Sequence, residues 1–183
     1  SDDDYHFVYH GSSLEIGEAA QHLDSFEVAS DATYGDEPLP LEATATSGLS
    51  VSFSSSNPEV VEVNGTRLNV RGAGTATITA HQPGDANFFG AADLNATVTV
   101  ATADLQVIAH PASKAYLDEN PELSFHYEGF VNGEDASVLD QEPTVSTTAT
   151  KASVAGTYDV NATGGSDDDY HFVYHGSSLE IGE

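Results

Sequence analysis

Short segments that alternate apolar and polar residues, each closed by turn-forming residues, run through the whole 183-residue chain. Alternation with a period of two is typical of a half-buried β-strand. No stretch sustains the 3.6-residue period of an amphipathic helix, and residues 134–139 amount to one helical turn at most. Pairs such as Asn57-Pro58, Asn64-Gly65 and Pro83-Gly84 supply the turn chemistry between segments. The predicted strands are 5–10, 13–16, 25–29, 41–46, 51–54, 60–63, 67–70, 75–80, 96–100, 105–109, 123–127, 144–148, 156–161, 170–175 and 179–181.

Strands this short and this regularly spaced predict an all-β chain built from β-sandwiches. The length fits two tandem domains of this sandwich type with a seam near residues 101–103. Tyr158, two residues after Gly156, is predicted to be a corner tyrosine whose hydroxyl caps a turn.

An identical repeat indicates how the domains follow one another. Residues 1–18 and residues 166–183 both read SDDDYHFVYHGSSLEIGE, an offset of 165 residues (166 minus 1). Identity over such a length indicates a tandem array, with an artificially duplicated segment as the alternative. A period of this length exceeds the roughly 20–50 residues of solenoid units and fits separate domains in line. In such an array, residues 1–18 are the closing hairpin of the preceding repeat, 19–101 form one domain and 102–183 form the next domain.

Each copy of the repeat is predicted to form a β-hairpin, because an aromatic alternation is followed by Gly-Ser and a second short apolar strand. We expect the copy at 166–183 to complete the second domain's sheet, with Leu179 and Ile181 adding apolar contacts. For the copy at 1–18 two supports are predicted. One is packing against residues 19–101, which the short link at 17–20 favours, and the other is docking on a neighbouring molecule.

The charge excludes two classes of partner. The chain has 30 acidic and 4 basic residues, a net charge of -26, so it has almost nothing to neutralise nucleic-acid phosphates or an anionic membrane. No apolar run approaches the roughly 18 residues of a spanning helix, which argues against membrane insertion.

The absence of cysteine excludes disulfides, iron–sulfur clusters and thiolate zinc sites. Acidic repeats repel one another at low salt, which favours an extended chain, and an acidic surface suits a saline habitat.

Several groups of polar residues are candidate metal ligands. The pairs His6/His10 and His171/His175 are four residues apart, which on a strand separates the two side chains by about 13 Å at a rise of roughly 3.3 Å per residue. One strand therefore does not chelate a metal, although pairing with another histidine across strands stays open. The runs Asp2–Asp4 and Asp167–Asp169 offer oxygen ligands for calcium but lack the spaced D-x-D-x-D-G pattern, so solvated acidic loops are the main interpretation.

Calcium is the candidate cofactor at the domain seams, and the metal site itself stays unknown. The acidic residues predicted to lie near seams are Glu15, Glu18, Asp104 and Glu180. 

No catalytic or cofactor-binding constellation is present. The chain has no G-x-S-x-G, no G-x-x-x-x-G-K and no H-E-x-x-H motif, so an enzyme is not predicted. Phe88-Phe89 in a loop is the candidate for a sugar-binding platform, with a capped sandwich end as the simpler interpretation. Asn64, Asn95 and Asn161 begin N-x-T sequons and are interpreted as turn asparagines.

Residues 33–100 carry motifs that make them similar to the bacterial Ig-like domain of group 2, or to the closely similar repeat of MBG-type surface proteins. The motifs are Tyr34-Gly35-Asp36, the run 54–58 with Val60, Val61 and Val63 after it, and the runs 72–80 and 84–88.

Residues 114–181 resemble the MBG domain proper. The motifs are the runs 114–121, 127–133, 146–150 and 156–158, followed by Tyr170, Phe172 and Tyr174. Leu117 stands where this family usually has the glycine of its Tyr-Gly-Asp motif, so that turn is expected to differ in detail.

The resemblance implies a function, since such domains form long arrays in secreted bacterial adhesins and share no active site. It implies an extracellular extender repeat at the bacterial cell surface, which spaces a distal binding region from the cell. Its partners are the neighbouring repeats, and a glycan or protein ligand binds elsewhere in the full-length protein. The alternative is a carbohydrate- or protein-binding module that uses loops at a sandwich end.

Overall fold

The computed structural model describes residues 11–183 of the chain, which form 15 strands, a single 3₁₀ turn and no α-helix. The all-β prediction is therefore confirmed for this range. No helix in residues 11–183 could cross a membrane. The strand predicted at 5–10 and the candidate ligands Asp2–Asp4, His6 and His10 lie outside the described residues.

The first domain is a sandwich of two four-stranded sheets, ordered β1-β3-β6-β5 and β2-β8-β7-β4. Its strands are β1 (Leu23–Val28), β2 (Asp31–Thr33), β3 (Leu39–Ala45), β4 (Ser52–Ser55), β5 (Val61–Asn64), β6 (Arg67–Val70), β7 (Gly74–His81) and β8 (Leu94–Ala101). Alternation in β7 buries Ala76, Ile78 and Ala80 and turns the threonines between them outward. Because its partner β8 buries Val98 and Val100 in the same way, the two strands face the other sheet with a continuous apolar surface.

The second domain pairs a three-stranded sheet, β11-β9-β14, with a four-stranded sheet, β10-β15-β13-β12. Its elements are β9 (Ala103–Ala109), β10 (Ala112–Ala115), β11 (Phe125–Glu128), the 3₁₀ turn η1 (Ala136–Val138), β12 (Thr144–Thr147), β13 (Gly156–Thr163), β14 (Tyr170–His175) and β15 (Ser177–Gly182). The helical turn predicted at 134–139 is thus η1. The predicted corner tyrosine is confirmed, because the Tyr158 hydroxyl donates to the Val154 carbonyl oxygen at 3.0 Å.

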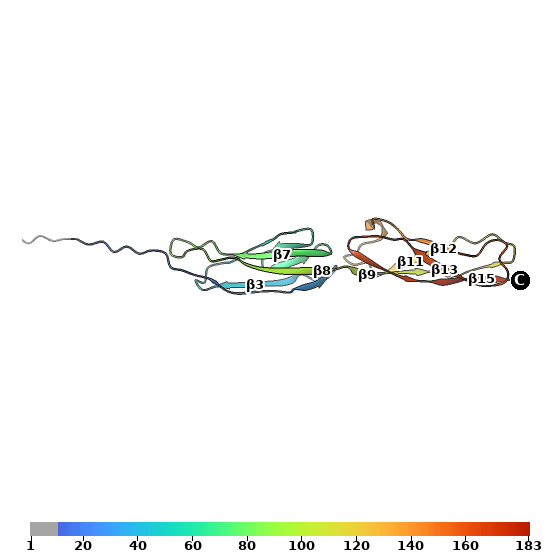
Figure 1. Ribbon diagram of the computed structural model, residues 1–183, viewed down its shortest axis with the longest axis horizontal. Helices are drawn as coiled ribbons and strands as arrows, with labels where there is room; N and C mark the ends of the chain where they lie inside the picture. Colours follow the sequence, from blue (N-terminus) through green and yellow to red (C-terminus); the bar gives the residue numbers. More distant parts are fainter. Residues whose placement is uncertain (1–10) are drawn as a thin grey trace, which may run out of the picture.

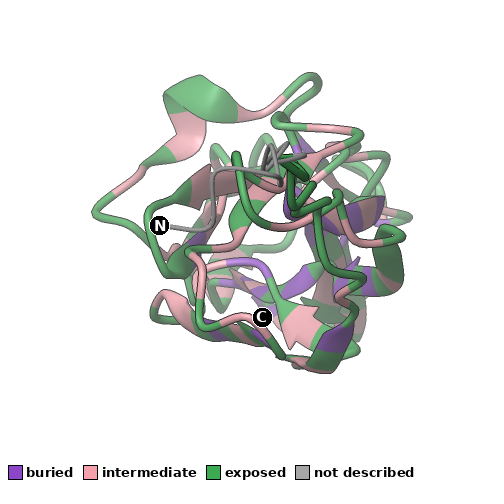
Figure 2. Ribbon diagram, turned by 90° about the vertical axis from the view of Figure 1, so that its left-hand side faces the viewer, coloured by how far each residue is buried: buried purple, intermediate pink, exposed green. Residues whose placement is uncertain are grey.

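All strand pairs join strands within 23–101 or within 103–182, and the two sandwiches lie end to end along the longest axis (Figure 1). Viewed along that axis, buried and exposed residues alternate along the strands (Figure 2).

The predicted hairpin at 166–183 is wrong. Strand β14 pairs with β9 in one sheet, whereas β15 lies between β13 and β10 in the other sheet. The single residue Gly176 separates them, so the chain steps from one sheet to the other instead of folding back on itself. The physical reason is burial: Tyr170 on β14 packs in one core cluster with Leu105, whereas Leu179 on β15 packs in another with Val160, and strands in two different sheets reach both clusters.

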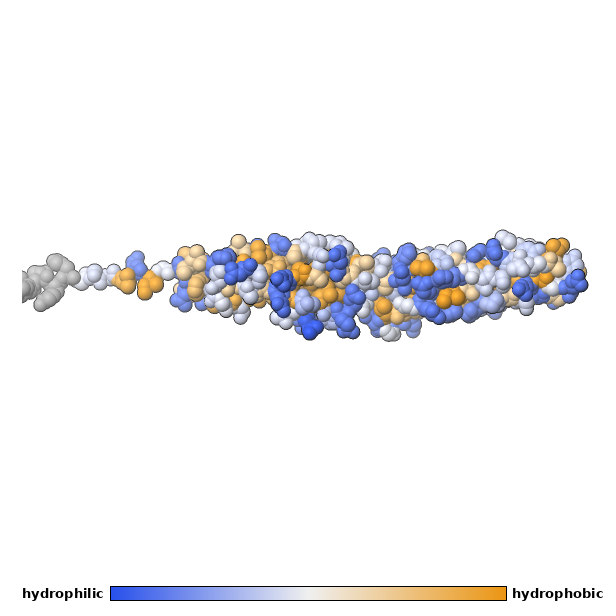
Figure 3. All heavy atoms as spheres, turned by 90° about the horizontal axis from the view of Figure 1, so that it is seen from below, coloured by the Kyte–Doolittle hydropathy of each residue, from blue (hydrophilic) through white to orange (hydrophobic). Residues whose placement is uncertain are grey.

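The first copy of the repeat differs from the second. Residues 11–18 form no strand, including the one predicted at 13–16, and each of them is exposed. The favoured packing of this segment on residues 19–101 is therefore absent from its described part. The first strand bridge, Ala19 with Phe88, begins only after the segment. Hydrophobic residues lie along the thin segment that precedes the first domain (Figure 3).

Leu117, which stands where the resembled family usually has glycine, still forms a turn, but its backbone lies in a strained region. Residues 33–36 form a turn closed by a hydrogen bond from Asp36 N to Thr33 O, with Gly35 at φ +93°. Residues 115–118 form a turn closed in the same way, from Asp118 N to Ala115 O, with Leu117 at φ +69°. Left-handed backbone at this position suits glycine and costs other residues roughly 1–2 kcal/mol.

Leu117→Gly should therefore stabilise the second domain by about 0.5–1 kcal/mol, the relief of strain less the backbone entropy of glycine. The Leu117 side chain is half-exposed, so little packing is lost. Urea unfolding of the variant measures the gain. Leu117→Ala is the control, since alanine keeps the strain, and an equal gain from alanine would contradict the explanation.

Candidate functional site: the junction between the two domains

The connection between the domains is a single residue. Strand β8 ends at Ala101, Thr102 follows, and β9 begins at Ala103. Two backbone hydrogen bonds hold this passage from either side: Tyr34 N donates to Ala101 O at 2.9 Å, and Ala103 N donates to Asp169 O at 2.9 Å. Each bond ties one end of the link to its own domain, so only Thr102 lies between the two.

Two tyrosines, one from each domain, meet across the junction. Tyr34 comes from the turn after β2, and Tyr170 is the first residue of β14. Their rings make an edge-to-face contact with centroids 5.6 Å apart, and Phe130 makes a second such contact with Tyr170 at 5.3 Å. Both tyrosines are buried and belong to one core cluster that runs from Leu41 and Ile78 to Leu105. The apolar core of the first domain thus continues into the adjoining end of the second domain.

A single carboxylate joins the two hydroxyls. Tyr34 Oη donates to Glu134 Oε1 and Tyr170 Oη donates to Glu134 Oε2, each at 2.7 Å. Tyr170 Oη also accepts from Val131 N at 3.0 Å. Hydrogen bonds to an ionised acceptor are among the stronger ones in proteins, and both here are partly buried. Glu134 therefore couples an element of the first domain to the sheet of the second.

A second carboxylate of the second domain also accepts a hydrogen bond from the first domain. Asp169 Oδ1, from the second domain, accepts a hydrogen bond from Ala73 N of the first domain at 2.5 Å. Burial raises the pKa of Asp169, and the hydrogen bond from the Ala73 amide opposes that rise.

Close backbone approach completes the junction. A β-carbon added to Gly35 would lie 2.6 Å from the β-carbon of Val131 in the other domain. No side chain fits in that space, so Gly35 serves both its turn and the contact between domains.

The buried phenol of Tyr34 makes the junction sensitive to alkaline pH. Burial, followed by the hydrogen bond to Glu134, raises the pKa of Tyr34 from 10.0 to about 12. The same two causes raise the pKa of Tyr170. The folded state thus favours the neutral phenols, and their contribution to stability is complete below pH 10 and lost as the pH rises towards 12.

We expect the free energy of unfolding to fall between pH 10 and pH 12, measured by urea titration at each pH. Tyr34→Phe removes one titrating group and should make this fall less steep. An unchanged slope in Tyr34→Phe would contradict the assignment.

The residues predicted to bind calcium at a seam do not come together. Asp104 lies on β9 and Glu180 on β15, in different sheets of the second domain, while Glu15 and Glu18 are exposed in the segment before the first domain. Within residues 11–183 no group of three or more His, Asp or Glu is placed to hold a metal ion. Of the predicted acidic run Asp167–Asp169, Asp169 forms part of the junction. Asp167 Oδ1 accepts from the amides of Asp169 and Tyr170.

The histidines of β14 find partners on the neighbouring strand β9. His171 Nδ1 lies 3.0 Å from Asp104 Oδ1, and His175 Nε2 lies 2.5 Å from Gln106 Oε1. The pairing of histidines across strands occurs elsewhere: His110 Nε2 lies 2.8 Å from His126 Nδ1, and the two rings stack.

The remaining candidates have structural roles or stay open. Phe88 bridges Ala19, and Phe89 is exposed in the loop between β7 and β8. Of the sequon asparagines, Asn64 ends β5 beside a turn. The prediction of a turn is wrong for the other two, because Asn95 lies within β8 and Asn161 within β13.

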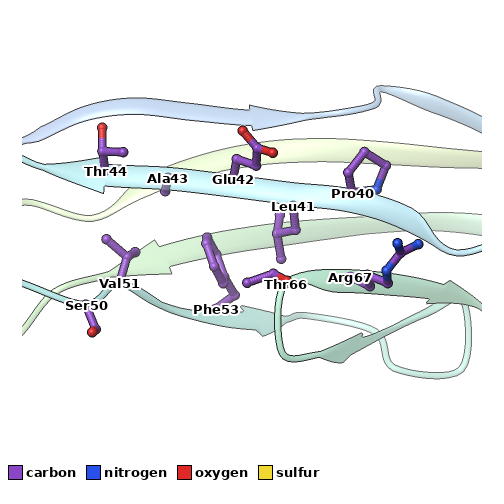
Figure 4. Close-up of a pocket in the computed structure, with 10 residues that line it drawn as sticks. All are labelled: Pro40, Leu41, Glu42, Ala43, Thr44, Ser50, Val51, Phe53, Thr66 and Arg67. Atoms are coloured by element: carbon purple, nitrogen blue, oxygen red, sulfur yellow. The ribbon is translucent and has the colours of Figure 1, made fainter.

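A groove of about 650 Å³ lies on the first domain, away from the junction (Figure 4). Strand β3 pairs with β6 only at Leu39 and Pro40, and beyond them the groove opens between β3 and the residues around β4. Its lining residues include the apolar Val51 and Phe53 and the charged Glu42 and Arg67, and the Glu42 side chain points away from Phe53 (Figure 4).

Glu134 is the functional residue that the sequence did not reveal. Nothing in its surroundings distinguishes it from the other acidic residues, whereas Tyr34 and Tyr170 stand in recognisable motifs.

The second domain matches a known family. The model of the MBG domain (YGX type), a repeat type of surface proteins, matches residues 105–180. The resemblance of residues 33–100 to group 2 Ig-like domains stays a prediction, because that match does not include them. No curated protein matches this chain.

Two solved structures show similarity at low identity. One is Drosophila N-cadherin EC1-3, with 11% identity and a TM-score of 0.30, covering 91% of this chain and 68% of that one. The other is the surface layer protein SbsC, domains 1-6, with 15% identity and a TM-score of 0.28. The match covers 92% of this chain and only 29% of the SbsC structure.

Proposed function

We propose that this chain is a non-enzymatic extender unit of a multi-repeat bacterial surface adhesin. It lies outside the cell and spaces a distal binding region from the cell surface, with neighbouring repeats as its partners. The observation that carries the proposal is the junction, where Glu134 joins Tyr34 and Tyr170 within one continuous core. A spacer keeps its two ends apart only if its domains do not fold back on each other. The contact of Glu134 with Tyr34 and Tyr170 opposes such bending. The MBG match of residues 105–180 supports a surface-protein repeat.

Stiffness of the junction is the property to measure. Because the chain has no cysteine, spin labels can be placed on exposed residues of each domain through Thr97→Cys on β8 and Thr157→Cys on β13. We expect one narrow distance distribution between the labels. Glu134→Ala should broaden it, while Asp140→Ala, an exposed carboxylate in the loop after η1, should not. A broad distribution in the parent protein would contradict the extender function.

Calcium stays a candidate at the seams. The same distance measurement with and without calcium tests it: a narrower distribution with the ion supports a stiffening site, and an unchanged one argues against it.

A binding module is the second candidate, favoured by the groove beside β3. Unpaired strand edges and nearby apolar side chains are suited to an extended ligand. A glycan array and whole cells that lack only these repeats separate the two functions. Binding that Glu42→Ala and Arg67→Ala abolish would favour the module.

A further inference from the structure

We infer that consecutive repeats meet at a second junction with the same backbone frame as the junction between the two domains, and that Tyr116 of one repeat packs there against Phe88 of the next. The inference rests on the proposed function, because it requires repeats that follow one another in one chain. It adds the residues through which a repeat contacts its neighbour.

The link between repeats is present in this chain. Residues 176–183 are identical to residues 11–18, and Ala19 follows the first of these copies. In the array, Glu183 is therefore followed by a residue equivalent to Ala19. Within the repeat, Thr102 alone separates β8 from β9. Between repeats, Glu183 has the corresponding position, because it directly follows the end of β15.

The end of the second domain repeats the arrangement at the end of the first. In the first domain, Tyr34 N donates to the carbonyl oxygen of Ala101, the last residue of β8, at 2.9 Å. In the second domain, Tyr116 N donates to the carbonyl oxygen of Gly182, the last residue of β15, at 2.9 Å. Each tyrosine directly follows a short strand, β2 or β10, that pairs in parallel with that last strand. Tyr116 is thus the counterpart of Tyr34.

The front of the second domain is defined by three hydrogen bonds. Ala103 N, just after the link, donates to Asp169 O at 2.9 Å. The amides of Asp169 and Tyr170 both donate to Asp167 Oδ1, at 2.8 and 3.1 Å. Ala103 also pairs in parallel with Tyr170. These bonds fix the place at which Tyr170 meets the preceding domain.

The front of the first domain has the same three hydrogen bonds. Ala19 N donates to Asn87 O at 2.7 Å. The amides of Asn87 and Phe88 both donate to Asp85 Oδ1, at 2.8 and 3.0 Å. The bridge between Ala19 and Phe88 is parallel as well. Phe88 is thus the counterpart of Tyr170, and the front of the first domain is built to follow another domain.

The two matching halves bring Tyr116 and Phe88 together. At the junction within the repeat, the rings of Tyr34 and Tyr170 make an edge-to-face contact with centroids 5.6 Å apart. A tyrosine and a phenylalanine make the same kind of ring contact, which does not need the second hydroxyl. The partner that fits Tyr116 is therefore the first domain of the next repeat.

The carboxylate of the first junction has no counterpart in the second. Glu134 lies in the loop between β11 and β12, and β11 pairs with β9, the first strand of its domain. The corresponding strand of the first domain is β3, which pairs with β1. The loop after β3, residues 46–51, contains no acidic residue. The contact between Tyr116 and Phe88 therefore acts without a bridging carboxylate, so its loss should loosen the junction.

A tandem chain of two repeats, in which residues 19–183 follow the last residue a second time, tests the inference. Spin labels at the exposed positions Thr99→Cys and Thr157→Cys of the first repeat report the first junction. Labels at Glu180→Cys of the first repeat and Thr75→Cys of the second report the second junction. The two pairs are equivalent, because Thr99 lies opposite Thr75 and Glu180 lies opposite Thr157. We expect one preferred distance for each pair, with equal means.

Substitutions at the rings test the contact itself. Tyr116→Ala in the first repeat should broaden only the second distribution, and Tyr34→Ala in the first repeat should broaden only the first. Phe88→Ala in the second repeat should have the same effect as Tyr116→Ala, and the double variant should broaden the distribution no further, because both changes remove one contact. The Tyr116 side chain is half-exposed, so we expect its domain to stay folded, which circular dichroism checks.

Failure of this inference and failure of the extender function give different results. A second distribution without a preferred distance, beside a narrow first one, would overturn the inference alone. A narrow second distribution that neither Tyr116→Ala nor Phe88→Ala changes would also overturn it. A broad first distribution would contradict the extender function, whereas a narrow second one that depends on Tyr116 and Phe88 would still support the inference.

Discussion

Leu179→Ala should lower the free energy of unfolding of the second domain by about 2–5 kcal/mol, the range for a buried leucine. Leu14→Ala, the same substitution within the same 18-residue sequence, should change it by no more than about 0.5 kcal/mol. Leu179 is fully buried between β13 and β10, and truncation leaves a cavity beside Val160. Leu14 has little contact to lose, because it is 85% exposed.

Urea unfolding followed by circular dichroism measures both variants at protein concentrations low enough to keep the chain monomeric. The pair is its own control, since local sequence, helix and strand propensities and net charge are the same. Equal losses from the two substitutions would mean that the first copy is also packed, contrary to the exposure of residues 11–18.

Glu134→Ala should lower the free energy of unfolding by about 2–4 kcal/mol, because hydrogen bonds to a charged group contribute roughly 1.5–3 kcal/mol and two are lost together. The Tyr34 and Tyr170 hydroxyls would remain buried without their acceptor. The loss should also separate the unfolding of the two domains, since the carboxylate joins them. Differential scanning calorimetry should then resolve two transitions in place of a more cooperative one.

Two variants control this experiment. Asp140→Ala removes an exposed carboxylate from the same region and should change stability by no more than about 0.5 kcal/mol. Glu134→Gln keeps one acceptor oxygen and should fall between the alanine variant and the parent. A Glu134→Ala variant as stable as Asp140→Ala would show that the two hydrogen bonds do not couple the domains.

The sequence by itself determined the class of fold and many of its strands. Period-two alternation and turn residues are local properties, so they place strands such as β7 and β8 without knowledge of their partners. The corner contact of Tyr158 is local in the same way, because its acceptor Val154 is only four residues away. Leu117 shows the limit of reasoning from local sequence. The turn at 115–118 forms as in the motif, although leucine replaces the glycine that suits its left-handed backbone.

Only the tertiary structure decided where strands from distant parts of the chain meet. At the junction Tyr34 binds Glu134, which is 100 residues further along the sequence. No local sequence pattern indicates that these two residues are partners. Pairing with distant strands likewise decides which sheet each strand joins: β14 pairs with β9, and β15 pairs with β13 and β10. The expected hairpin between β14 and β15 therefore did not form. The identical copies show this most directly: Ile181 is buried and Ile16 is exposed, although their surroundings in sequence are the same. Strand propensity is the same in the two copies, so it does not explain the difference. Neighbouring strands supply hydrogen bonds and a core to the copy at 166–183, whereas the described residues 11–18 of the other copy have neither.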